Sequence, residues 1–518
     1  MPAKSRKSAG MPSFSPLRNF FRLASTRELL LWCLPALVCG GIARLLLIIH
    51  FPYTYLHPDS PDFLVTANAF LIHHRFVLHG KKSFLGPILF TLPMVLKMPS
   101  LLVVSWAQHF LGLIYVVMAG AIVRCWTTLW RWWIVPATLL VALNPASLYY
   151  EHALIAESQY LWCVTALVLA GSAFALHRTP GRFILLLVLL LLTAGSRPEG
   201  KLFVVFCLIL IPLVYWGQWR LFAVYGAITL LFSTLTWFTS RNTQAGILLY
   251  ATLLPLAPDI PRSAPDFGPL IAPLRARRLA QGTLALPDYV IEEKEISPIV
   301  FSYLKAKTGS EKTAGDFCQR LAVEAALHSP FLLPPLALDK FLMGTIYPTN
   351  EGFLKPWLQD RQIDSATYKT WMVKLMPRLT GRPIHSADDV AAYIRQEFPP
   401  LQPDWFNQLQ SLWFRATVGA RIALPGQPTI PGIPLFYILA AAGMVAALLR
   451  PGPMQKVHFA WVVTLLFIAF VVMLTGPVVP RYRFVFEPFA VIYIFVLMDV
   501  ILGVGARRAP RAEPSPKP

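Results

Sequence analysis

Long apolar runs recur from one end of the chain to the other, and each is about as long as the apolar core of a bilayer is thick. A helix that crosses that core needs roughly 17–25 mostly apolar residues. Runs that approach this length occupy residues 29–50, 100–123, 133–150, 158–177, 183–196, 201–216, 221–239, 434–449, 457–477 and 484–505. We therefore predict an all-α polytopic membrane protein with about 10–11 transmembrane helices.

Two further apolar segments fit a spanning helix less well. Segment 84–98 contains two prolines and a lysine, which favour a re-entrant or surface-lying piece. It would be the eleventh span if it crossed the membrane. Segment 330–346 is a similar case.

The composition excludes several other classes of protein. Hydrophobic residues make up 56% of the 518 and charged residues only 14%, whereas a soluble protein carries roughly 25% charged residues. A water-soluble globule, a disordered chain and a collagen-like repeat are thereby excluded. The six cysteines form neither a disulfide framework nor a C-x-x-C metal motif.

The basic residues predict how the chain is oriented. The net charge is +20, from 46 Lys and Arg against 26 Asp and Glu. If the basic N-terminal tail lies in the cytoplasm, every other cytoplasmic segment is basic as well, as the positive-inside rule requires. These segments carry Arg124 and Arg131, Arg178 and Arg182, Arg220, Arg450 and Lys456, and Arg507, Arg508 and Arg511. We expect an integral membrane protein with both termini cytoplasmic; no nucleic-acid motif is visible.

This topology divides the chain into five parts. They are a cytoplasmic basic tail (1–28), an N-terminal transmembrane module (29–239) with a first extracytoplasmic loop (51–99), an extracytoplasmic domain (240–433), C-terminal transmembrane helices (434–505) and a disordered cytoplasmic tail (506–518). The extracytoplasmic domain has ordinary polar composition and helix-like stretches such as 314–328. We expect it to be mainly helical.

Four groups of ionisable residues fall on the predicted outer face, where charges close to the bilayer are costly and often functional. The first is HPDSPDF at 57–63, with His57, Asp59 and Asp62. Asp62 suits the first turn of a helix capped by Ser60, which would give it a structural role. Asp59 precedes that cap and is not explained in this way.

The other three groups follow later in the chain. The segment EHALIAES at 151–158 contributes Glu151, His152 and Glu157, although a polar turn between helices is an equal alternative. In SRPEG at 196–200, Arg197 either pairs internally with Glu199 or binds an anion. In RYRFVFEP at 481–488, Arg481 and Arg483 flank Tyr482, an arrangement suited to a phosphate, to which Lys81 and Lys82 could add. Snorkelling is the alternative for these arginines.

Taken in this order, the four motifs resemble those of the GT-C membrane glycosyltransferases, which use polyprenyl-phosphate sugars and include protein mannosyltransferases and lipid A aminoarabinose transferases. The resemblance covers most of the membrane part but not 240–433. It implies that Asp59 is the catalytic base, that Asp62, Glu151 and Glu157 are additional acidic or metal candidates, and that His57, Glu199 and Tyr482 support the site. It also implies that the donor phosphate is bound by Arg197, Arg481, Arg483, Lys81 and Lys82. The usual motif often has two adjacent acids, whereas Ser60 and Pro61 separate Asp59 from Asp62 here.

The activity implied is transfer of a sugar from a polyprenyl-phosphate donor to a glycan, lipid or protein acceptor at the outer face of a bacterial inner membrane. The cofactor is unknown, and a divalent cation such as Mg²⁺ or Mn²⁺ stays open. The main alternative is a lipid or solute transporter or flippase without sugar transfer, which predicts internal repeats and charges along a central path. A polysaccharide polymerase or ligase, and a scaffold whose outer domain binds partners, are further alternatives.

Overall fold

The protein is helical throughout the part of the chain that the structure describes. The computed structural model describes residues 26–50, 54, 60, 63, 69, 85–96, 98, 100–129, 131–215, 218, 221, 223–230, 243–280, 289–310, 313–337, 385–386, 389, 403–418, 435–475 and 486–508. Within these ranges the elements are α- and 3-10 helices, without a β-strand. The predicted all-α class is therefore confirmed for the described residues.

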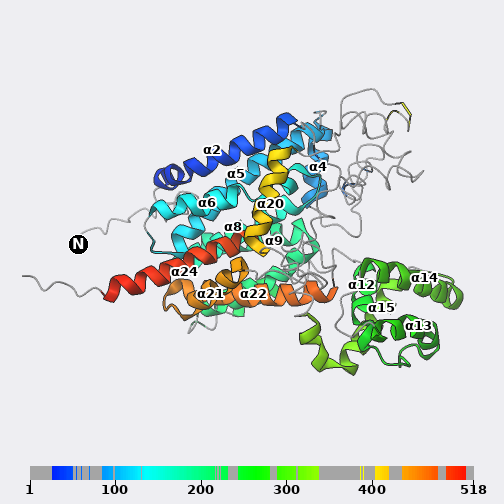
Figure 1. Cartoon of the computed structure of the whole chain (residues 1–518). Helices are drawn as coiled ribbons and strands as arrows, with labels where there is room; N and C mark the ends of the chain where they lie inside the picture. The colour runs from blue at the N-terminus through cyan, green and yellow to red at the C-terminus, as the bar shows by residue number, and fades with distance from the viewer. Residues whose placement is uncertain are drawn as a thin grey trace, which may run out of the picture.

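Most of the helices form one elongated bundle, in which they lie side by side along a common direction (Figure 1). Its members are α2 (Thr26–His50), α5 (Ser100–Trp126), α6 (Ile134–Ala142), α7 (Pro145–His152), α8 (Glu157–Leu176), α9 (Pro180–Ser196), α10 (Val204–Val214), α21 (Leu435–Leu449), α22 (Pro453–Thr475) and α24 (Glu487–Arg508). The short helix α4 (Leu85–Val95) packs against α5 and α9.

Several bundle helices are long and apolar enough to cross a membrane. Four described segments meet this requirement: Arg27–His50, Leu102–Trp126, Glu157–Leu176 and Met454–Val472. The predicted span 133–150 is broken into α6 and α7, which meet at 50° and together give a fifth possible crossing. Asn144 accounts for the break, because its side chain accepts a hydrogen bond from Ser147 N at the start of α7 and Pro145 follows it. The count of ten stays a prediction.

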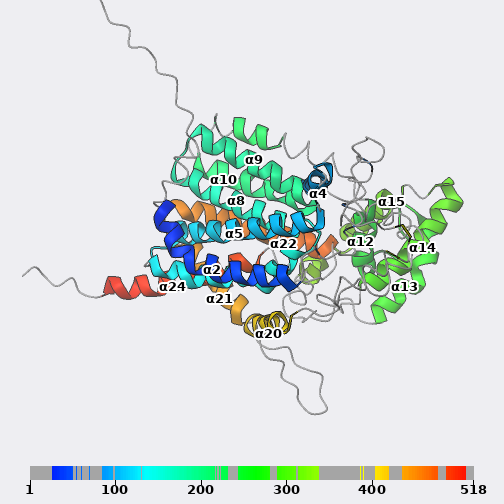
Figure 2. The same cartoon turned by 90° about the horizontal axis from the view of Figure 1, so that it is seen from above.

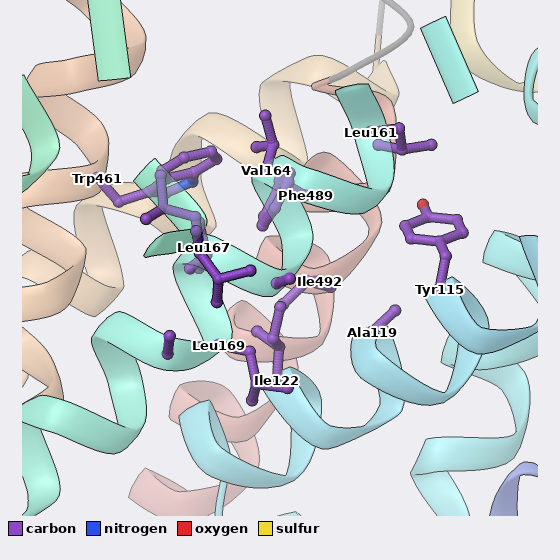
Figure 3. Close-up of a cluster of buried hydrophobic side chains, with 14 of the residues drawn as sticks. Tyr115, Ala119, Ile122, Leu161, Val164, Leu167, Leu169, Trp461, Phe489 and Ile492 are labelled. Carbon is purple, nitrogen blue, oxygen red and sulfur yellow. The ribbon is translucent and has the colours of Figure 1, made fainter. Parts of the chain in front are cut away.

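Helix α8 is the centre of the bundle, and nearly all of its residues are buried. Figure 3 shows its side chains Val164 and Leu167 among side chains of α5, α22 and α24, including Trp461 and Phe489. Burial of each such large apolar side chain stabilises the fold by roughly 1.5–3 kcal/mol in water. Where the bundle crosses lipid, close packing rather than expulsion of water holds the helices together.

A second, separate core lies beyond one end of the bundle (Figures 1 and 2). It is formed by α12 (Thr243–Leu253), α13 (Gly268–Ala280), α14 (Tyr289–Thr308) and α15 (Ala314–His328), which we call the outer module. The predicted helix at 314–328 is confirmed. Helix α12 contacts α22 and so joins the outer module to the bundle.

Helix α20 (Asp404–Val418) comes from the same long polar region but lies elsewhere. It packs on α7 and α21, and Phe406 is buried against Ala43, Leu47 and Leu148 of the bundle. The predicted domain 240–433 therefore contributes described helices to two places: a module with its own core, and a helix laid across the bundle.

The two ends of the bundle carry different connections. At the terminal end, α2 begins and α24 finishes, at Arg508. At the other end, which we call the loop end, α2 finishes, α8 and α24 begin, and the outer module is attached.

Candidate functional site

The loop end contains a buried ion pair between α2 and α7. Arg44 donates through Nε to Glu151 Oε2 and through Nη2 to Glu151 Oε1, both at 2.7 Å. Its Nη1 donates to the carbonyl oxygens of Gly40 at 3.0 Å and Ala142 at 3.1 Å. The Arg44 and Glu151 side chains are only 2% and 3% exposed. This two-bond geometry compensates two charges that would otherwise be very costly inside the bundle.

Two histidines extend this pair into a chain of polar groups. Nδ1 of His109 lies 3.0 Å from Glu151 Oε2, and its Nε2 lies 2.8 Å from Nδ1 of His152. Ser105 Oγ lies 3.4 Å from the same His152 nitrogen. Gly112 of α5 leaves the space for the carboxylate, because a Cβ there would lie 2.2 Å from Glu151 Oε1. We call Arg44, Glu151, His109 and His152 the histidine chain.

The turn between α7 and α8 connects this chain to the first-loop motif. Ser60 of that motif is fully buried, and its hydroxyl donates to the carbonyl oxygen of Leu154 at 2.8 Å. Gln108 supports the same turn by donating to Ile155 O at 3.2 Å and Ser158 Oγ at 2.9 Å. The motifs at 57–63 and 151–158 therefore meet at Ser60. His57, Asp59, Asp62, Lys81 and Lys82 lie outside the described residues.

Arg197 sits between two carboxylates. Its Nη1 donates to Glu157 Oε1 at 2.5 Å, and its Nε donates to Glu199 Oε2 at 3.1 Å. The internal pair with Glu199, one of the two sequence-based alternatives, is therefore present together with a second partner. Glu157 is the first residue of α8, where the helix dipole favours a carboxylate. The Arg197 guanidinium also lies over the Tyr160 ring, 5.7 Å from its centre.

Glu487, at the start of α24, is the third buried carboxylate cluster at this end. It accepts hydrogen bonds from Asn144 Nδ2 at 2.9 Å, Trp413 Nε1 at 3.2 Å and Tyr437 OH at 3.3 Å. These donors come from the α6–α7 break, α20 and α21. Glu487 thereby fastens α20 to the bundle. Arg481, Tyr482 and Arg483, the other candidate site residues of this motif, lie outside the described residues.

Sequence reasoning missed two members of the histidine chain, Arg44 and His109. Both stand inside apolar runs predicted to be spans, and an ionisable residue at membrane depth is itself a signal of function or pairing. That rule was applied only to the loops. The donor Tyr437 carries no such signal, because aromatic residues are common near the ends of spanning runs. Trp413 lies in the long polar region, where a tryptophan by itself does not indicate its partner.

The described residues were also tested as a metal site. Among them, His, Cys, Asp and Glu side chains form no group of three or more that could hold a metal ion. Both oxygens of Glu151 are bound by Arg44, and Glu157 is bound by Arg197. The described acidic candidates therefore act as partners of arginines in this structure.

No protein-family model matches the chain, and no curated protein sequence matches it.

Proposed function

We propose that the protein is a membrane glycosyltransferase that moves a sugar from a polyprenyl-phosphate donor to an extracytoplasmic glycan, lipid or protein acceptor. The observation that carries this proposal is that described residues of all four motifs lie at the loop end. Three contacts show this: Ser60 against the 153–156 turn, Arg197 against Glu157, and Glu487 against Asn144. Residues far apart in sequence thus gather at one end of a helical bundle. In our proposal the lipid-linked phosphate approaches this end.

The reaction we propose is a single displacement. The acceptor hydroxyl oxygen attacks the anomeric carbon, and its proton passes to the carboxylate of Asp59. The bond between the anomeric carbon and the phosphate oxygen breaks, and the phosphate leaves on its lipid with the electron pair. Arginine side chains stabilise the charge that develops on that phosphate.

The contacts of Arg197 sharpen its proposed role. Two carboxylates already neutralise this guanidinium, so a phosphate would bind to it only by displacing one of them. We therefore assign the first phosphate contact to Arg481 and Arg483, with Lys81 and Lys82 as helpers. Arg197 binds the phosphate after its ion pair with Glu199 breaks. Glu199 is the partner that the phosphate displaces, because it is the more exposed of the two carboxylates.

The histidine chain has a supporting role in this proposal. Its members are bonded to one another and buried, so they hold the 153–156 turn against which Ser60 rests. Ser60 directly follows Asp59, the proposed base, in the sequence.

The decisive experiment is turnover of the purified full-length protein with a polyprenyl-phosphate sugar and an acceptor extract. Asp59→Asn keeps the size of the side chain and removes its basicity, so we expect turnover to fall by about 10²–10⁴-fold, the contribution typical of a general base. Asp266→Asn in the outer module is the matched control and should leave turnover unchanged. Wild-type turnover by Asp59→Asn would remove Asp59 as the base.

The same purified protein and donor lipid distinguish sugar transfer from the transporter alternative. In proteoliposomes, a flippase would move the labelled donor lipid between leaflets without consuming it, whereas a transferase releases the lipid phosphate. Translocation without loss of the sugar from the donor would favour transport and overturn sugar transfer.

A further inference from the structure

Helix α15 and the turn that follows it carry large apolar side chains that are exposed and not buried in the core of the outer module. We call them the α15 stripe. The stripe comprises Val323 and Leu327 of α15 together with Phe331 and Leu332 of the 3-10 turn that follows it (Pro330–Leu332). Their side chains are 50%, 75%, 91% and 44% exposed. The opposite face of α15 is buried in the outer module through Phe317, Leu321 and Ala325, among others. A neighbouring set of large exposed apolar side chains is a mark of an interaction surface.

Basic side chains border the stripe. Arg320 is exposed one turn before Val323. Glu324 faces away to hold the loop before α13, accepting from Ser263 N at 3.1 Å, Ser263 Oγ at 2.8 Å and the backbone N–H of Arg262. That loop carries exposed Arg262 and a further exposed apolar side chain, Ile260. Long arginine side chains beside apolar residues are suited to a surface with apolar depth and negative charge at its rim.

The position of the stripe agrees with such a surface. The described residues after α15, 329–337, extend from the outer module back toward the loop end of the bundle, in the yellow-green part of Figures 1 and 2. The module is joined to the bundle through α12 and α22. If the bundle crosses a bilayer, the end of α22 marks its boundary, and the segment 329–337, which contains Phe331 and Leu332, extends toward that boundary.

We propose that the α15 stripe rests in the headgroup region of the lipid bilayer, with Phe331 and Leu327 inserted and Arg320 and Arg262 paired with anionic lipid phosphates. Exposed phenylalanine and leucine side chains beside arginine are typical of interfacial membrane contacts. Here the arginines are Arg320 and Arg262, and α15 itself also carries Asp316 and Glu324. The outer module would then have two attachments, α12 to the bundle and the stripe to the lipid. The inference rests on the bundle spanning a membrane and does not depend on sugar transfer.

The test is the accessibility of spin labels in the full-length protein, reconstituted in nanodiscs of phosphatidylcholine and phosphatidylglycerol. Labels are attached at Leu327→Cys and Phe331→Cys, with Cys39→Ser to remove the exposed native thiol. Ser302→Cys, exposed on α14 of the same module, is the control. We expect the ratio of oxygen to nickel-chelate collision to be several-fold higher at 327 and 331 than at 302.

Two outcomes would overturn the proposal. Equal chelate access at 327, 331 and 302 would place the stripe in water, and low access to both reagents at 327 and 331 would show that protein covers it. A photo-crosslinking amino acid in place of Phe331 gives a second measurement. A lipid adduct supports the proposal, and a peptide adduct, whether from residues 338–384 or from a second copy, contradicts it.

Discussion

The two ends of the helical bundle hold their charges in different ways. At the terminal end, Arg131 pairs with Glu28 and Arg450 pairs with Asp499, and in each pair the arginine is substantially exposed, at 53% and 32%. At the loop end, Arg44 and Arg197 are buried together with their carboxylates. Arginines at the terminal end can reach headgroups or water. Those at the loop end are held by protein alone.

The two ends should therefore differ in how much stability is lost when one partner of an ion pair is removed. A buried pair is weak as a source of stability, but removing one partner leaves an uncompensated charge inside the protein. An exposed pair contributes little either way because water replaces the lost partner. Paired substitutions at the two ends therefore separate the two environments.

The largest effect is expected for Glu151→Leu, which strands the Arg44 guanidinium and removes the partner of His109. We expect destabilisation of about 3–5 kcal/mol, the usual result of breaking a buried ion pair. It is measured as a drop in the thermal unfolding temperature of the detergent-purified protein. The double variant Arg44→Leu with Glu151→Leu should recover part of the loss, because no charge is then left unpaired. A double variant less stable than the single one would contradict this account.

A smaller effect is expected for Gly112→Ala, which adds a methyl group where the Glu151 carboxylate now lies. The new Cβ would stand 2.2 Å from Glu151 Oε1, so the pair with Arg44 must shift. Overpacking of this kind costs typically 1–3 kcal/mol. Gly41→Ala on α2 is the control, since a Cβ there meets nothing within 4 Å. Equal unfolding temperatures for the two variants would mean that the histidine chain adapts freely.

The smallest effect is expected at the terminal end, for Glu28→Gln. Its partner Arg131 is more than half exposed, so the change should cost about 0–1 kcal/mol and should shrink further in high salt. Thermal unfolding at low and high salt gives the measurement. A loss as large as that of Glu151→Leu would remove the contrast between the two ends.

Local sequence signals predicted much of the helical structure. The predicted helix at 314–328 matches α15, and the span predicted at 158–177 matches α8 within one residue at each end. Such matches are possible because apolar run length, caps and breakers act over a few residues. The break at Asn144–Pro145 shows the limit of apolar run length as a signal. The run at 133–150 predicts a single span, although the residues that break the helix are present in it.

The arrangement of the candidate site depended on packing across the bundle. The sequence placed Glu151, Glu157 and Arg197 at one predicted face because the spans alternate in direction. Only the tertiary structure paired Glu151 with Arg44, 107 residues away, and joined Asn144, Trp413 and Tyr437 at Glu487. Apolar run length indicates that a helix forms but not how that helix is rotated against its neighbours. That rotation, set by close packing around α8 and by small residues such as Gly112, decides which charges meet.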